Sequence, residues 1–215
     1  QEAALKQLAG LVERVLEADR FPFVIGGEHA LTAGAIRPLA AAYHDLVVLQ
    51  FDAHADLRDG YQGEHYSHAS AMRRVLDHAH VQLVSVGIRA LSSPEADFAR
   101  RHPERVAIHW AKDQAAWDIE AMLAPLKGKP VYLTFDIDAL DSAIMPATGT
   151  PTPGGMAYWQ SLAILKRACA VAGRIVGADL VELAPQPGLH ACDYTAAHLA
   201  YKMMSYALSG TMARG

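Results

Sequence analysis

Three short apolar segments of the chain each end in a cluster of acidic and histidine residues. Residues 21–25, 46–51 and 131–135 are rich in apolar side chains and lack the polar alternation of a half-exposed strand. They therefore predict three buried strands. In a parallel sheet the carboxyl ends of the strands meet at one edge, where ligands and catalytic groups gather. The chain must therefore fold so that several charged groups share that edge.

Six side chains that can bind a metal ion are predicted at this edge: His29, Asp52, His54, Asp56, Asp136 and Asp138. The three that follow the second strand are spaced two residues apart, so they project from one face if the chain stays extended. The two that follow the third strand have the same spacing. Oxygen ligands mixed with imidazole suit a divalent ion such as Mn, Zn or Fe.

The four carboxylates of this set favour two bound ions over one. Crowded carboxylates repel one another, and their pKa values rise unless cations compensate the charge. Two divalent ions balance four negative charges. The sequence therefore predicts a binuclear metal site, and the alternative is a set of helix caps and surface charges on unrelated loops.

Strand and helix patterns alternate along the whole chain. Further strands are predicted at residues 82–86, 105–109 and 174–182, and helices at residues 2–19, 31–43, 69–78, 94–101, 114–125, 156–171 and 195–208. Such alternation is typical of a mostly parallel sheet with helices on both faces. We therefore expect one α/β domain over residues 1–215, with a long loop at residues 141–155 beside the ligand edge.

The overall composition narrows the class of protein. A net charge of −4 and the lack of a basic run give no reason to expect nucleic acid as a partner. The two cysteines, Cys169 and Cys192, lie outside any paired metal-binding spacing. No apolar stretch or signal peptide points to a membrane or to export. We expect a cytoplasmic enzyme, and the start at Gln1 inside a helical pattern indicates a fragment of a longer polypeptide.

Five motifs occur in an order that is characteristic of one enzyme family. They are Gly26-Gly27-Glu28-His29, FDAHAD at residues 51–56, YSHAS at residues 66–70, FDID at residues 135–138, and Val181-Glu182. Together they resemble the ureohydrolases, which include arginase, agmatinase and formimidoylglutamase. Residues 66–69, 149–151 and 154–155 look most like agmatinase. The resemblance covers nearly all of the chain, but family members carry an additional N-terminal segment that this chain lacks.

The resemblance implies a three-layer αβα fold and a centre of two manganese ions. One ion would be held by His29, Asp52, Asp56 and Asp136, and the other by His54, Asp52, Asp136 and Asp138. Family members hydrolyse a guanidino group to urea and an amine, and agmatine is the expected substrate, with putrescine as the second product. Guanidinobutyrate, guanidinopropionate and the substrates of arginase and formimidoylglutamase are the alternatives. Family members also assemble into trimers or hexamers, which is an argument from analogy alone.

Two further side chains are expected to act on the substrate. Glu182 ends a predicted strand, and a carboxylate there can accept two parallel hydrogen bonds from a planar guanidinium. The matching glutamate of the family has this role. His68 is the expected proton shuttle, because histidine titrates near neutrality, and His65 is a competing candidate. Asp179 is expected to make a structural hydrogen bond.

Three other classes of protein compete with this hypothesis. A phosphoesterase would carry an Asn-His-Asp motif or a basic phosphate clamp, and neither occurs in the sequence. A single-zinc deacetylase of related topology needs only three ligands, which leaves His29 or the pair Asp136 and Asp138 without a role. A ureohydrolase-like subunit that binds metal without catalysis is the third alternative, and the missing N-terminal family segment keeps it open.

Overall fold

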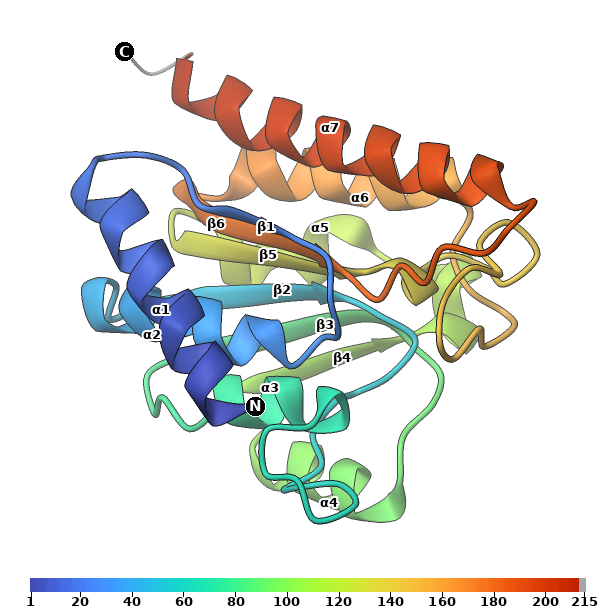
Figure 1. Cartoon of the computed structure of the whole chain (residues 1–215), viewed down its shortest axis with the longest axis horizontal. Helices are drawn as coiled ribbons and strands as arrows, with labels where there is room; N and C mark the ends of the chain where they lie inside the picture. Colours follow the sequence, from blue (N-terminus) through green and yellow to red (C-terminus); the bar gives the residue numbers. More distant parts are fainter. Residues whose placement is uncertain (213–215) are drawn as a thin grey trace.

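A central sheet with helices on both faces forms the core of the protein (Figure 1). The computed structural model describes residues 1–212, and its six strands form one sheet in the order β1-β6-β5-β2-β3-β4. The strands are β1 (Phe23–Ile25), β2 (Val47–Phe51), β3 (Gln82–Ile88), β4 (Val106–Trp110), β5 (Pro130–Asp136) and β6 (Arg174–Val181). Every pair of neighbouring strands is parallel. The predicted three-layer α/β fold is confirmed.

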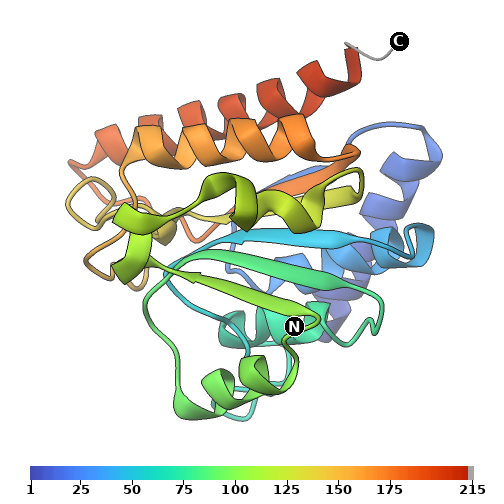
Figure 2. The same ribbon diagram turned by 180° about the vertical axis from the view of Figure 1, so that it is seen from behind.

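Helices cover both faces of this sheet. They are α1 (Glu2–Glu17), α2 (Leu31–Ala42), α3 (Ala71–Val75), α4 (Ser93–Arg101), α5 (Ile119–Leu123), α6 (Tyr158–Val171) and α7 (His190–Met212). Helices α6 and α7 lie side by side on one face, and α1 and α2 pack together on the other (Figures 1 and 2). None of the helices in the described part of the chain combines the length and apolar character needed to cross a membrane.

Two apolar cores hold the layers together, one on each face of the sheet. On the first face Phe51 of β2 belongs to the same buried cluster as Leu165 of α6. On the second face Val48 of β2 shares a cluster with Ile36 of α2. Burying a Leu, Ile or Phe side chain contributes about 1.5–3 kcal/mol. Because β2 is covered on both faces, all of its side chains are buried, which explains why four of its five residues are apolar.

Two strands end differently from the expectation, and both differences shape the site. Strand β2 ends at Phe51, so the chain does not stay extended through residues 52–56. At Asp56 the backbone turns, with a φ of 53°. Strand β5 ends at Asp136 and is followed by a short 3-10 helix, Ile137–Ala139. The expected alternation of side chains is therefore wrong at both positions.

Three helices also differ from their predicted bounds. The pattern at residues 69–78 corresponds to a 3-10 turn, His68–Ser70, followed by the short α3. The pattern at residues 114–125 is divided between the end of a 3-10 helix, Ala111–Ala116, the short α5 and the start of another 3-10 helix, Ala124–Leu126. The side chain of Asp118 accepts a hydrogen bond from the backbone N–H of Ala121, so α5 starts as a new helix there. The last helix begins at His190, five residues before the predicted start at Thr195, directly after the loop that contains Gly188 at a φ of 88°.

Candidate metal centre

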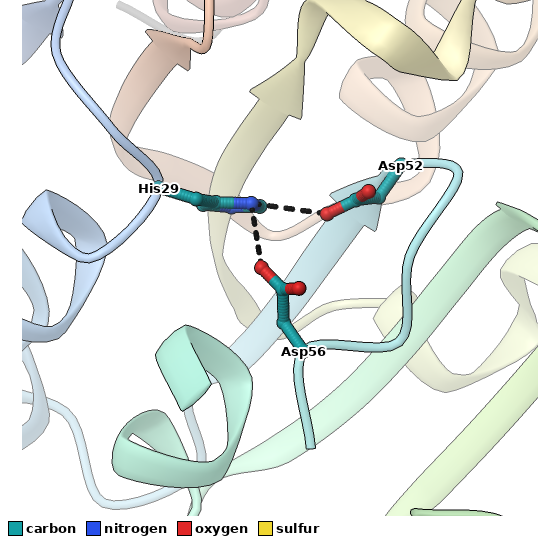
Figure 3. Close-up of side chains that lie close together, drawn as sticks. All are labelled: His29, Asp52 and Asp56. Carbon is teal, nitrogen blue, oxygen red and sulfur yellow. Dashed lines mark ion pairs between the residues drawn. The ribbon is translucent and has the colours of Figure 1, made fainter. Parts of the chain in front are cut away.

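The predicted ligands converge at the carboxyl edge of the sheet in two groups that share one residue. In the first, His29 Nδ1 lies 3.0 Å from Asp52 Oδ2, 3.0 Å from Asp56 Oδ2 and 3.3 Å from Asp136 Oδ2. Figure 3 shows the side chains of Asp52 and Asp56, both from the loop after β2, pointing toward the ring of His29, which comes from a separate segment of the chain. We call His29, Asp52, Asp56 and Asp136 the His29 group. All four are buried.

The second group is built around His54. Its Nδ1 atom lies 3.0 Å from Asp138 Oδ2 and 3.5 Å from Asp52 Oδ1. We call His54, Asp52 and Asp138 the His54 group. Asp52 therefore presents one carboxylate oxygen to each histidine. The ligand atoms of His29, Asp52 and Asp56 lie close enough together to hold a metal ion, and so do those of the His54 group.

Turns, rather than strand alternation, bring these side chains together. The Asp52 carboxylate accepts a hydrogen bond from His54 N at 2.6 Å, which folds the chain back directly after β2. Asp136 accepts one from Asp138 N at 2.9 Å in the same way after β5. Asp138 then accepts a hydrogen bond from Ala53 N at 3.0 Å, so the two turns are tied to each other. The result is the convergence that the sequence predicted, by a different local geometry.

The two histidines have pKa values that reflect a large excess of negative charge. Burial lowers the pKa of His29, but its three carboxylate neighbours outweigh burial and hold the pKa well above the ordinary value of 6.5. Burial also lowers the pKa of His54, yet Asp138 and Asp52 raise it to about 11.

The pKa values of the carboxylates also reflect the excess of negative charge. Burial and the charge of Asp52 raise the pKa of Asp56 to about 7. Burial and the charges of Asp138 and Asp52 raise the pKa of Asp136 well above its ordinary value. Burial raises the pKa of Asp52 too, but His29 and His54 outweigh it and leave the pKa below its ordinary value. Divalent cations would relieve this repulsion directly.

One buried atom shows how the site fits a metal ion. His29 Nδ1 faces three carboxylate oxygens, yet it has no hydrogen-bond partner. Its other nitrogen, Nε2, is already within 2.8 Å of Thr134 Oγ1. A buried nitrogen that lacks a partner and faces carboxylates is suited to bind a cation through its lone pair.

A cavity of about 580 Å³ opens over both groups, and Glu182 and His68 are part of its wall. Glu182 has a φ of 64°, and its Oε1 accepts a hydrogen bond from His29 N at 2.6 Å. Burial raises the pKa of Glu182. His68 is half-exposed, with Nδ1 3.4 Å from Glu28 Oε2. His68 therefore lies where a proton shuttle can reach a bound substrate.

His65, the competing candidate, lies elsewhere. Its ring contacts the guanidinium of Arg74 and packs edge-on against Tyr66, with ring centroids 4.8 Å apart. His65 is not among the described residues that line the cavity. The geometry therefore favours His68 for the predicted role.

Two polar residues beneath the site were missed by the sequence reasoning. Gln50 donates a hydrogen bond to Asp52 Oδ2 at 2.8 Å and accepts one from Ser85 Oγ at 2.6 Å. Thr134 contacts His29 Nε2. Both are polar residues inside an apolar strand, two positions before an aspartate of the site, and this pattern is a signal that was available in the sequence.

Arg89 is a third residue that was missed. Its guanidinium donates hydrogen bonds to the carbonyl oxygens of Thr152 at 2.6 Å and Asp138 at 2.7 Å. These contacts hold the long loop at residues 141–155 against the turn after β5. No local pattern marks Arg89, because its partners lie 49 and 63 residues away in the sequence.

Comparison with known proteins gives a consistent result. The chain is 35% identical to the N(1)-aminopropylagmatine ureohydrolase of Synechocystis sp., over 95% of this chain and 67% of that protein. It is 37% identical to the agmatinase of Bacillus cereus, over 86% of this chain and 62% of the relative. The chain thus spans about 62–67% of the length of these curated relatives.

Solved structures show the same fold. The agmatine ureohydrolase of Thermoplasma volcanium matches with a TM-score of 0.82 and 30% identity, over 96% of this chain and 69% of that chain. Proclavaminate amidino hydrolase from Streptomyces clavuligerus matches with a TM-score of 0.84 and 27% identity, over 96% of this chain and 70% of that chain. A model of the arginase family matches residues 1–208. The resemblance to the ureohydrolases is confirmed, and the chain belongs to the arginase family.

Proposed function

We propose that this protein is a hydrolase that uses two divalent metal ions to cleave a guanidino group into urea and a primary amine. One observation carries the proposal: the two ligand groups share Asp52 beneath a cavity whose wall contains Glu182 and His68. The metal expected from the family resemblance is Mn²⁺. One ion would be held by His29, Asp52, Asp56 and Asp136, and the other by His54, Asp52, Asp136 and Asp138.

Two ions held by these residues would supply a water molecule whose pKa is lowered toward neutrality. Residues of the chain would orient the substrate above it. Glu182 offers a carboxylate to a planar guanidinium, and two parallel hydrogen bonds would fix both the position and the plane of that group. The hydrogen bond from His29 N to Glu182 Oε1 ties this carboxylate to the His29 group. The guanidino carbon is thereby held over the metal ligands.

His68 would complete the reaction by donating a proton to the leaving amine. An amine is a poor leaving group unless it is protonated, and a histidine that titrates near neutrality can both hold and release the proton. The half-exposed position of His68 also lets the ring recover a proton from solvent after each turnover.

Agmatine is the leading candidate substrate, because several of the similar proteins are agmatinases. N(1)-aminopropylagmatine is a second candidate, since the relatives from Synechocystis sp. and Thermus thermophilus carry that substrate in their names. Guanidinobutyrate, guanidinopropionate and the substrates of arginase and formimidoylglutamase remain the alternatives. A subunit that binds metal without catalysis is the alternative outside the enzymes.

The decisive experiment measures urea release by the full-length protein after loading with MnCl₂. Agmatine, N(1)-aminopropylagmatine, arginine and guanidinobutyrate are compared side by side, and metal content is measured by elemental analysis. We expect two ions per chain and the highest kcat/KM for agmatine. Two bound ions with no urea from any compound would support the non-catalytic subunit instead.

Further properties of the whole protein are also predictions. We propose that residues 1–215 act as one ureohydrolase-like domain, because segments attached to one sheet supply every residue of the site. A small guanidino compound is the expected partner, with neither nucleic acid nor membrane. We also propose a cytoplasmic location and, by family analogy alone, assembly into trimers or hexamers. Sedimentation of the full-length protein would test the assembly.

A further inference from the structure

A buried chain of hydrogen-bonding groups leads away from His29, on the side opposite to the carboxylates. His29 Nε2 lies 2.8 Å from Thr134 Oγ1, and that oxygen lies 3.4 Å from Thr32 Oγ1. Thr32 Oγ1 in turn lies 2.7 Å from Asp179 Oδ2. Tyr132 reaches the same carboxylate oxygen, also at 2.7 Å. None of these residues is more than 1% exposed.

The fold itself places these groups in a row. Thr134 of β5 and Asp179 of β6 are direct partners in the register of two neighbouring parallel strands, so both side chains point to the same face. Helix α2 packs over that face and contributes Thr32 from its first turn. His29 lies just before the same helix. Sheet and helix together fix every member of the row.

The direction of the hydrogen bonds follows from what each group can donate. Asp179 Oδ2 is the shared acceptor of the hydroxyls of Thr32 and Tyr132. Each threonine has a single hydroxyl hydrogen. Because Thr32 gives its hydrogen to Asp179, its oxygen can only accept a hydrogen from Thr134. Thr134 has then used its own hydrogen, so its oxygen must accept one from His29 Nε2.

We propose that Asp179, acting through Thr32 and Thr134, holds His29 in the form that carries hydrogen on Nε2 and leaves Nδ1 to bind metal. A histidine binds a metal through the lone pair of an unprotonated nitrogen, and the hydrogen bond of the other nitrogen decides which one that is. Usually the second nitrogen of a metal-binding histidine bonds directly to a carboxylate, a backbone carbonyl or water. Here two threonine hydroxyls lie between His29 Nε2 and the carboxylate of Asp179. These are positioning residues, since none of them faces the cavity.

The His54 group has no such arrangement. The nearest polar atom to His54 Nε2 in the described contacts is Thr152 Oγ1 at 3.5 Å, on the loop beside the cavity. The row beneath His29 therefore acts on one metal position and not on the other. This selectivity separates a positioning role from a general contribution to stability, which would affect both positions.

The consequence for metal binding rests on the proposed function and is tested by titration with Mn²⁺. Thr134→Val removes the hydroxyl at nearly constant shape, and Thr134→Ser keeps the hydroxyl. We expect Thr134→Val to weaken binding of one of the two ions by about 10–100-fold, the usual cost of losing an outer partner of a metal ligand. Binding of the other ion should be unchanged, and Thr134→Ser should retain both affinities.

The direction of the hydrogen bonds is tested separately in the metal-free protein. In protein labelled with ¹⁵N-histidine, the wild type and Thr134→Ser should show a slowly exchanging proton on His29 Nε2, and Thr134→Val should lose it. Thr32→Val breaks the row one step further out, so it supplies the same test if Thr134→Val does not fold. Thr32→Val should also lose the slowly exchanging proton on His29 Nε2.

The two experiments distinguish the failure of each hypothesis. A wild-type protein that binds no Mn²⁺ but shows the threonine-dependent proton would refute the proposed function and leave the positioning role of Asp179 supported. A wild type with no protected proton on His29 Nε2 would overturn the positioning role. Valine variants that bind both ions with wild-type affinity would overturn it as well.

Discussion

The two halves of the candidate metal centre share Asp52 but are built in different ways. The side chain of His29 is 1% exposed, whereas that of His54 is 28% exposed. His29 is backed by the buried row that ends at Asp179, between the sheet and α2. His54 faces the cavity and approaches Thr152 on the long loop at residues 141–155.

This difference separates two tasks that one site must perform. Groups fixed by strands and a packed helix keep their geometry, and loops beside a cavity vary and recognise ligands. The His29 group, with Glu182 attached through His29 N, is suited to hold the reacting guanidinium in place. The His54 group lies next to the loop that would contact the rest of the substrate. We therefore expect mutations in the two halves to affect different steps.

The largest effect is expected where the two halves meet. Asp52→Asn removes charge from the one carboxylate that faces both histidines, so we expect both ions to be lost and turnover to be abolished. Elemental analysis after dialysis and a urea assay measure the two losses. Asp45→Asn, an exposed carboxylate just before β2, is the matched control. If Asp52→Asn kept either ion at wild-type affinity, the two halves would be independent and the comparison would fail.

A large effect is next expected at the cavity wall, outside both ligand groups. His68→Asn should keep both ions and lower kcat by about 100-fold or more, the usual contribution of a general acid. His65→Asn is the control, because His65 is only three residues away but packs against Arg74 and Tyr66. Equal losses in the two variants would remove His68 from the reaction.

A smaller effect is expected at the carboxylate that belongs to the buried half. Glu182→Gln should keep both ions but lower kcat/KM for agmatine on the order of 30-fold, since about 2 kcal/mol is lost when a charged hydrogen-bond acceptor becomes neutral. Glu64→Gln, on an exposed loop, is the control. Unchanged substrate affinity and rate in Glu182→Gln would show that the guanidinium binds elsewhere.

Glu182 also gives the site a pH dependence with a definite sign. Burial raises the pKa of Glu182 above its ordinary value of 4.5. Because the proposed function requires the ionised form of Glu182 to bind the guanidinium, kcat/KM should fall as the pH is lowered through this raised pKa, at a higher pH than for an exposed glutamate. The pH profile of Glu182→Gln should lack that fall. A profile that is identical in the two proteins would contradict the assignment.

The sequence was sufficient to predict the fold and the convergence of the ligands. Strands that are almost wholly apolar, such as 46–51, identify a sheet that is covered on both faces, and the polar residues after them must lie at its carboxyl edge. The local geometry was predicted wrongly, because the carboxylates of Asp52 and Asp136 accept hydrogen bonds from the backbone two residues later and end the extended chain. A hydrogen bond from Ala53 N to Asp138, which is distant in the sequence, then ties the two turns together. Strand alternation cannot describe such turns.

The supporting residues were harder to predict than the ligands. Gln50 and Thr134 interrupt apolar strands two positions before Asp52 and Asp136, so their pattern was present in the sequence. The pattern does not identify their further partners, because Ser85, which bonds to Gln50, and Thr32, which contacts Thr134, come from other elements. Arg89 was the hardest residue to predict, because the carbonyl oxygens that it binds lie 49 and 63 residues later in the sequence.

The smallest effect is expected for Arg89, and it tests whether the His54 group and the loop at residues 141–155 contribute to substrate binding. Arg89→Lys keeps the charge but cannot reproduce the planar set of donors that reaches the carbonyl oxygens of Thr152 and Asp138. We expect KM for agmatine to rise about tenfold, because about 1.4 kcal/mol of loop-holding hydrogen bonding is lost. Both ions and kcat should be nearly retained, since no hydrogen bond or ion pair among the described residues joins the side chains of the His29 group to the loop.

Arg101→Lys is the control for this change, because Arg101 lies exposed at the end of α4, where its guanidinium contacts Asp97 O. Limited proteolysis offers a second measurement: cleavage within residues 141–155 should become faster in Arg89→Lys and stay unchanged in Arg101→Lys. If Arg89→Lys instead lost the ions and left KM unchanged, Arg89 would belong to the metal centre through Asp138. The proposed division would then be wrong, in which the His29 group holds the reacting guanidinium and the His54 group with its neighbouring loop recognises the rest of the substrate.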